Sequence, residues 1–334
     1  MSQIEMIDAV KEFKIKTRRK GAFHSVKDFF NPLYKNKRAV DGISLKVEKG
    51  DLVGYIGPNG AGKSTTLKML TGILVPTSGQ VRVDGRIPYR ERRYNAMIMG
   101  AVFGQRSQLL WDLPVSDTLE LYQKMYRIDP PRYRHNRDYF VELLDMSGFM
   151  EQPARQLSLG QKMRANLALA MLHDPDILYL DEPTIGLDVI AKDRIRGFIR
   201  QVNREKQTTV MLTTHDMTDI ESVCKRLVLI DGGKKLYDGS LDAFKARYAT
   251  TYVLKILFAS EDIKIEDPRF REISRKGRDV EFSICRDDLK AGEALSLLAK
   301  SQELVDVAVR ETPIEEIVRK LYLGASSADG FSDI

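Results

Sequence analysis

Short apolar runs alternate with longer amphipathic stretches through most of the chain. Residues 52–56 and 177–180 are almost continuously apolar, which is typical of parallel strands buried on both faces. The longer stretches repeat apolar residues at helical spacing, with a break at Pro130-Pro131. The expected helices cover residues 65–70, 116–149, 161–172 and 191–204, and further strands are expected at 4–13, 43–47, 80–85, 97–103, 209–213 and 227–230. This alternation predicts an α/β fold with a parallel sheet.

The pattern changes near Ala249. Two alternating strands at residues 252–258 and 280–284 precede a helix at 291–298 and a strand at 304–309. Thr312-Pro313 then opens a last helix, with Glu315 placed as in a capping box. We therefore expect a first domain over residues 1–248, a small α+β domain over 249–323, and a flexible tail over 324–334.

Composition indicates the cellular compartment and reveals one unusually basic segment. The two cysteines are far apart in the sequence, and no signal-peptide pattern or long apolar span is present, so we expect a reduced, intracellular protein that does not cross a membrane itself. The net charge is +6, yet residues 11–38 alone contain ten lysines and arginines against two acidic residues. The basicity is therefore one local segment, and the rest of the chain is nearly neutral.

The candidate chemistry begins directly after the first apolar run. Residues 57–64 read Gly-Pro-Asn-Gly-Ala-Gly-Lys-Ser, between an expected strand and an expected helix. In this setting, backbone N–H groups surround a phosphate at the helix N-terminus, Lys63 reaches the β- and γ-phosphates, and the Ser64 hydroxyl binds Mg²⁺. The alternative is an ordinary glycine-rich turn, which the flanking strand and helix disfavour. The motif predicts binding of a nucleoside triphosphate.

Two further motifs have a catalytic and a structural interpretation. Asp181-Glu182 ends the second apolar run, where one carboxylate suits Mg²⁺ and the other suits the activation of water, although an Asp that caps a helix is the plain alternative. Residues 157–161, Leu-Ser-Leu-Gly-Gln, fit a capping box of Ser158 and Gln161. The same helix N-terminus with Gly160 also suits an anion, and both interpretations can hold together.

The order of these motifs resembles that of the nucleotide-binding subunits of ABC transporters over about residues 3–245. The residues that carry the resemblance are 57–64, Gln105, 157–161, 177–182, Gly186-Leu187-Asp188 and His215. Within the family, the chain is most similar to ATPase subunits of bacterial exporters whose permeases are separate polypeptides. The resemblance implies a P-loop NTPase core with a mixed sheet, an antiparallel β subdomain and a helical signature subdomain.

The resemblance also implies roles for individual residues. Glu182 is the general base, His215 contacts the γ-phosphate, and Gln105 holds Mg²⁺ with Ser64 and Asp181 and senses the membrane partner. Without this context, His215 would be an ordinary surface histidine. Phe13 stacks on adenine, with a core phenylalanine as the alternative. The remaining residues expected to bind ATP are Asn59, Gly60, Ala61, Gly62, Lys63, Thr65, Ser158, Gly160, Gln161 and Asp188.

These roles describe a homodimer that hydrolyses ATP with Mg²⁺ as cofactor. It is expected at the cytoplasmic face of the membrane, bound to permease subunits through residues 105–114. Trp111 in that segment is either an interface anchor or a core residue. Two departures from the family pattern stand out: Leu159 replaces a glycine of the signature, and a basic insertion covers about residues 14–38. The insertion is either a solvated loop or a contact to the permease or anionic lipid.

Two other functions remain as alternatives. The first is a soluble ATPase of this type acting on nucleic acid or ribosomes. Such proteins usually carry two ATPase modules or a long coiled-coil insertion, and neither is found in this sequence, so we expect no nucleic-acid partner, although the basic segment keeps this alternative open. The second is a regulatory ATP-binding module, which Glu182 and His215 disfavour. The transported substrate is not expected to be readable from this chain, because in such transporters it meets the permease.

Overall fold

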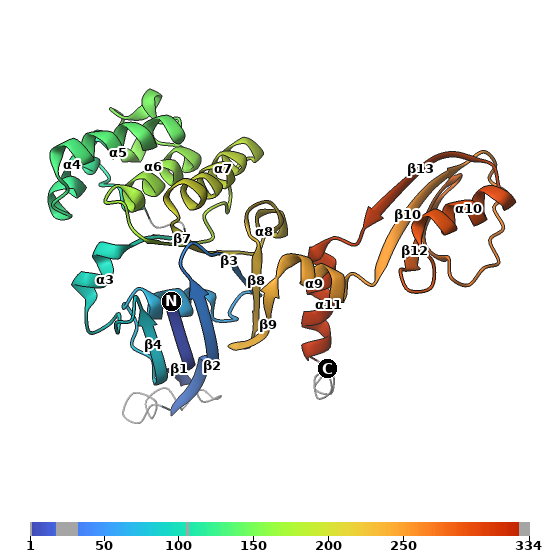
Figure 1. The fold of residues 1–334 in the computed structure, drawn as a ribbon, viewed down its shortest axis with the longest axis horizontal. Coiled ribbons are helices and arrows are strands. Elements are labelled where there is room, and N and C mark those ends of the chain that lie inside the picture. The colour runs from blue at the N-terminus through green and yellow to red at the C-terminus, as the bar shows by residue number, and fades with distance from the viewer. Residues whose placement is uncertain (1, 18–32, 105–106, 327–334) are drawn as a thin grey trace, which may run out of the picture. The chain divides into compact units, whose positions relative to one another are not determined.

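The computed structural model describes residues 2–17, 33–104 and 107–326 (Figure 1). These residues form two compact units, Met1–Gly239 and Ser240–Ile334, and each is described by itself below. The predicted domain boundary at residues 248 and 249 falls at the end of α9 (Leu241–Tyr248), in the second unit, and stays a prediction. Among the described helices, none combines the length and the apolar character that a membrane crossing requires.

The first unit is built on a sheet whose central strands are parallel. Within the described residues its order is β5 (Met99–Phe103), β6 (Ile177–Asp181), β7 (Thr209–Thr214), β3 (Leu52–Ile56), β8 (Arg226–Asp231) and β9 (Lys234–Ser240). Every residue of β3, β6 and β7 is buried, as the continuous apolar runs predict for β3 and β6. The four neighbouring pairs from β5 to β8 are parallel, so the carboxyl ends of these strands share one edge. The predicted α/β fold is confirmed.

A second, antiparallel sheet packs against the first through one helix. Its order among the described strands is β2 (Leu33–Glu48), β1 (Ser2–Thr17) and β4 (Ser78–Val83). The core around α2 (Lys63–Leu70) joins Leu67 and Leu70 to Ile4 and Val81 of this sheet and to Tyr55 of β3. The helix is therefore held between two sheets, and the phosphate-loop motif at its start is fixed from both sides.

The hairpin of β1 and β2 is longer than predicted. Strands were expected at residues 4–13 and 43–47, yet pairing continues to Thr17 opposite Leu33. The outer parts of the predicted insertion at 14–38 are thus strand residues that extend the sheet. Its middle, residues 18–32, lies outside the described residues.

Outside its two sheets, the first unit is mostly helical (Figure 1). The stretch predicted at 116–149 forms α4 (Val115–Met125) and α5 (Pro130–Leu143), and the two prolines begin α5, where a missing N–H costs nothing. These helices pack with α6 (Leu159–Met171). The bounds of the other helices are α3 (Arg92–Ile98), α7 (Val189–Lys206) and α8 (Met217–Val223). The strand predicted at 97–103 is wrong at its start, because α3 includes residues 97 and 98.

The second unit is an α+β fold, as predicted. In the described part of the chain its sheet has the order β11 (Arg271–Lys276), β12 (Asp279–Cys285), β10 (Thr251–Phe258) and β13 (Leu304–Glu311), with every pair antiparallel. Alternate residues of β10 and β12 are buried against α10 (Ala291–Ser301). The last helix, α11, spans Ile314–Ser326, so it includes the first three residues of the predicted tail, and residues 327–334 lie outside the described residues.

Candidate functional site

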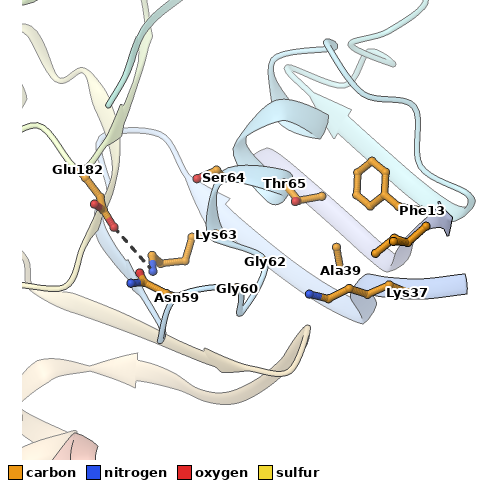
Figure 2. Close-up of a pocket in the computed structure, with 11 residues that line it drawn as sticks. Phe13, Lys37, Ala39, Asn59, Gly60, Gly62, Lys63, Ser64, Thr65 and Glu182 are labelled. Atoms are coloured by element: carbon orange, nitrogen blue, oxygen red, sulfur yellow. Dashed lines mark ion pairs between the residues drawn. The ribbon is translucent and has the colours of Figure 1, made fainter. Parts of the chain in front are cut away.

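A pocket of about 460 Å³ opens at the carboxyl end of β3, beside the start of α2 (Figure 2). Most of the phosphate-loop residues predicted from the sequence line it, together with Glu182 from the end of β6. Three lining residues, Ile15, Lys37 and Ala39, were not predicted. The full lining is Phe13, Ile15, Lys37, Ala39, Asn59, Gly60, Gly62, Lys63, Ser64, Thr65 and Glu182.

The loop before α2 needs glycine where the chain passes closest to its neighbours. Gly62 has φ +110°, and a Cβ at this position would lie 2.3 Å from the carbonyl oxygen of Ala39. At Gly57 a Cβ would lie 2.6 Å from the carbonyl oxygen of Ile230. No side chain caps the N-terminus of α2. The first N–H groups of the helix are therefore available for an anion in the pocket, and the helix dipole favours a negative charge there.

Lys63 is almost fully buried at the base of the pocket. Its ammonium donates hydrogen bonds to the carbonyl oxygens of Gly57 (2.7 Å) and Pro58 (3.2 Å) and lies 3.9 Å from Glu182 Oε1. Burial lowers the pKa of Lys63, and the nearby carboxylates of Glu182 and Asp181 oppose this shift. A desolvated ammonium is strongly attracted to a phosphate oxygen, because little water lies between the two charges to screen them.

Asp181 and Glu182 stand on the shared edge of the parallel strands, as predicted. Asp181 is 8% exposed and accepts a hydrogen bond from the Thr213 hydroxyl at 2.6 Å, so the alternative of a helix cap is wrong. Glu182 has φ +54°, and its N–H donates to the carbonyl oxygen of Thr213 at 2.9 Å. The turn at Glu182 places its side chain between Lys63 and His215. His215 Nδ1 lies 3.6 Å from Glu182 Oε1.

The oxygen donors near the pocket suit Mg²⁺. Ser64 supplies a hydroxyl and Asp181 a carboxylate, and Mg²⁺ in nucleotide sites takes one or two such protein ligands beside phosphates and water. The third predicted ligand, Gln105, lies outside the described residues. It follows Gly104, whose N–H donates to the carbonyl oxygen of Asp181 at 2.7 Å.

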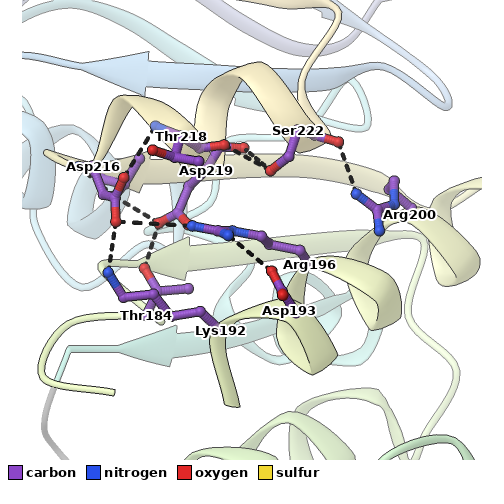
Figure 3. A network of polar contacts seen from close by, with 10 residues as sticks. Thr184, Lys192, Asp193, Arg196, Arg200, Asp216, Thr218, Asp219 and Ser222 are labelled. Carbon is purple, nitrogen blue, oxygen red and sulfur yellow. Dashed lines mark hydrogen bonds and ion pairs between the residues drawn. The ribbon is translucent and has the colours of Figure 1, made fainter. Parts of the chain in front are cut away.

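A network of polar contacts surrounds Asp219 (Figure 3), and its bonds to Thr184 and Thr214 join the turns that carry Glu182 and His215. Its centre is Asp219, which is 1% exposed and accepts hydrogen bonds from the hydroxyls of Thr184 and Thr214 and from Arg196 Nε. Thr184 follows Glu182 by two residues, and Thr214 directly precedes His215. Sequence reasoning missed this network, because neither Arg196 nor Asp219 belongs to a recognisable motif.

The signature residues do not line the pocket of their own chain. Ser158 and Gln161 form the predicted capping box of α6, with the Ser158 N–H bonded to Gln161 Oε1 (2.8 Å) and the Gln161 N–H to Ser158 Oγ (3.2 Å). Asp188 is exposed and caps α7 by accepting from the N–H of Ala191. Gly160 lies beside α7, because a Cβ there would be 3.4 Å from the Ala191 Cβ. These residues thus form a second surface apart from the pocket lining.

Aromatic residues settle two of the open alternatives. Phe13 lines the pocket and is 37% exposed, so the alternative of a core phenylalanine is wrong. Trp111 is 64% exposed, which likewise excludes a core role, and the ammonium of Lys162 lies 5.4 Å from the centre of its ring. His215 is also exposed at the edge of the site.

Comparison with known proteins identifies the family. The ABC transporter family matches residues 40–185. The ABC transporter ATP-binding protein NatA of Bacillus subtilis (strain 168) is 31% identical over 206 residues, which cover 62% of this chain and 83% of NatA. The Nod factor export ATP-binding protein I of Paraburkholderia xenovorans (strain LB400) is 33% identical over 288 residues, or 84% of this chain and 93% of that protein.

Solved structures agree on the fold. The ATP-binding cassette MJ0796, solved as a dimer in a post-hydrolysis state bound to ADP and Pi, superposes with a TM-score of 0.60 over 71% of this chain and 98% of its own, at 24% identity. The phosphate loop, the paired carboxylates and these relatives agree, and the chain belongs to the ABC transporter family as an ATP-binding subunit that hydrolyses ATP for transport.

Proposed function

We propose that this chain drives export as an ATP-dependent homodimer, in which each ATP lies between the pocket of one copy and the signature surface of the other. The observation that supports this most directly is the separation of the two surfaces. Ser158, Gly160 and Asp188 are absent from the lining of the pocket. A second copy can bring the N-terminus of α6 to the γ-phosphate, where the helix dipole favours a negative charge.

Within the pocket, the residues divide the work by position. Lys63 and the N–H groups from Asn59 to Thr65 hold the phosphates, and Phe13 lies where an adenine ring can stack. Glu182 orients the attacking water and accepts its proton, while His215, 3.6 Å from Glu182, holds the γ-phosphate. Ser64, Asp181 and Gln105 would hold Mg²⁺, which would neutralise negative charge on the phosphates when bound.

Exposed apolar residues support a membrane-protein partner. Leu110, Trp111 and Leu113 are between 40% and 64% exposed, close to Gln105 in the sequence. Tryptophan is enriched among the residues that contribute most to binding at interfaces, and the two leucines would add apolar area to the contact. We infer that separate permease subunits bind this segment and hold the chain at the cytoplasmic face of the membrane. The similarity to a Nod factor export protein favours export as the direction of transport.

The nucleic-acid alternative is less well supported, because two described basic residues of the N-terminal segment, Lys11 and Arg38, have local partners. Arg38 pairs with Glu12 at 2.7 Å and with Asp41 at 3.0 Å. Lys37 lines the nucleotide pocket, and Lys11 bonds to the carbonyl oxygen of Val75. The proposal that anionic lipid binds residues 14–38 depends on Arg18, Arg19 and Lys20, which lie outside the described residues, and it stays a prediction.

Mixing two inactive variants tests the shared site. Lys63→Ala disables the pocket and Ser158→Arg disables the signature, so a mixed dimer contains one site with both halves intact. We expect the mixture to recover part of the ATPase activity. Lys63→Ala mixed with Glu182→Gln is the matched control, because both changes disable pockets and no intact site can form. Equal activity of the two mixtures, or full-rate hydrolysis by dilute monomers, would contradict the proposal.

A further inference from the structure

The two edges of the sheet in the second unit differ in how they are protected from other strands. At one edge, β11 is charged at four of its six positions, Arg271, Glu272, Arg275 and Lys276. At the other edge, β13 has an uncharged centre at residues 307–309, and Val305 and Val309 are 59% and 49% exposed. In the described part of the chain, β13 pairs with β10 alone. Charged edges resist pairing with another strand, whereas an apolar edge invites it.

The hydrogen-bond pattern shows which backbone groups of β13 face outward. The Phe258 N–H at the end of β10 donates to the carbonyl oxygen of Arg278, on the side of β12. Bonding alternates along an antiparallel strand, so Lys255 bonds to β13 instead, where its partner is Ala308. The backbone of Ala308 is therefore satisfied by β10. The N–H and C=O groups of its two neighbours in β13 point away from the sheet.

We propose that β13 pairs with β13 of a second copy of this chain, antiparallel and about a two-fold axis through Ala308. In this register, Val307 of each copy lies opposite Val309 of the other. Within one chain the Val307 N–H donates to Asp306 Oδ1 at 2.8 Å, so pairing exchanges this local bond for one to the Val309 carbonyl oxygen of the second copy and frees the Asp306 carboxylate. Asp306 lies opposite Arg310 of the second copy, and the two-fold axis repeats this ion pair on its other side. An edge that complements itself is what a two-fold interface requires.

Both faces of the joined sheet fit this register. Val307 and Val309 pair with Ile256 and Leu254, so they stand on the face that α10 covers, and the new pairs extend that apolar face. Asp306, Ala308 and Arg310 stand on the other face. Their new pairs would lie at the narrow, non-hydrogen-bonded positions, where opposite charges approach most closely.

Other registers lose these matches. A shift by one residue places outward backbone groups opposite groups that already bond to β10. A shift by two residues places Arg310 opposite Ala308 or Leu304 of the second copy, and leaves Asp306 opposite Thr312 or Ala308. The register centred on Ala308 is therefore the one in which backbone, apolar side chains and charges all agree.

Charge exchange tests the pairing in the full-length chain without nucleotide, so that an ATP-dependent dimer does not contribute. We expect a concentration-dependent dimer by analytical ultracentrifugation. Asp306→Arg or Arg310→Asp should weaken it about tenfold or more, because each change places like charges together twice. The double variant Asp306→Arg/Arg310→Asp should restore it. Arg271→Glu on the opposite edge is the matched control and should have no effect.

Cysteine cross-linking tests the register independently, in a Cys285→Ser background. Ala308→Cys should form a disulfide between copies on mild oxidation, because this residue faces itself across the axis. Asp306→Cys and Arg310→Cys should not, since each lies about 13 Å from its own copy across the axis, four residues along the strand. A monomer at all concentrations, a double variant as weak as the single ones, or cross-linking equal at the three positions would overturn the proposal.

Discussion

Replacing Asp219 with alanine should destabilise the first unit by about 3–5 kcal/mol, the usual cost of breaking a buried ion pair. Asp219 is 1% exposed, and its Oδ1 lies 2.6 Å from Arg196 Nη2, whose side chain is 10% exposed. Without the carboxylate, the guanidinium stays buried with weaker partners, and the hydroxyls of Thr184 and Thr214 lose their acceptor. Most of the cost comes from the guanidinium, which stays buried with Asp193 at 3.0 Å and Asp216 at 3.8 Å as its weaker partners.

Urea unfolding followed by circular dichroism measures this loss. Asp219→Asn keeps the shape and an acceptor oxygen, so it should cost less than alanine. In the double variant Asp219→Ala/Arg196→Met, the loss of stability should be at least about 1 kcal/mol smaller than the sum of the two single losses, because the second change removes the guanidinium that the first leaves with weaker partners. A loss below about 1 kcal/mol for Asp219→Ala, or strict additivity in the double variant, would refute this reasoning.

Two further predictions address the pocket and the response to pH. Phe13→Ala should raise the KM for ATP about tenfold, the value of one aromatic stack, while Phe13→Trp should keep it near the original; equal effects of both variants in steady-state ATPase assays would argue against stacking. Burial lowers the pKa of His173 to about 4. Below pH 6.5 the unfolded chain therefore binds a proton at this residue while the folded chain does not, so the free energy of unfolding falls as the pH drops from 6.5 to 4. Over this range the free energy of unfolding should fall by up to about 3 kcal/mol more than in a His173→Gln variant, as measured by denaturant unfolding at each pH. Parallel pH profiles of the two proteins would contradict a lowered pKa at His173.

Local sequence patterns were enough to predict the parts of the site that are made from neighbouring residues. The phosphate loop, the buried strands around it and the capping box of Ser158 and Gln161 depend on spacing within a few residues, which the sequence displays directly. The same holds for Asp181-Glu182, because the end of a continuous apolar strand marks the edge where ligands bind.

Features formed between distant segments could not be predicted in this way. The pairing of Phe13 with Lys37 depends on a hairpin register set across the long segment between β1 and β2, so the sequence did not indicate that Lys37 lines the pocket. Asp219 meets Arg196 only because α7 and α8 pack together. Thr213 was expected as a strand residue, and its bond to Asp181 follows from the pairing of β6 with β7.

The general-base role of Glu182 is the central claim about the chemistry of this pocket. Single-turnover hydrolysis of ATP by Glu182→Gln, with ATP binding measured in parallel, tests it most directly. Because glutamine keeps the shape of the side chain and cannot accept the proton, binding should stay near its original strength while hydrolysis slows about a hundredfold or more. An ATP-bound dimer should then accumulate and elute early in size-exclusion chromatography. Near-normal turnover in this variant would contradict the general-base role of Glu182 and assign proton removal to another group.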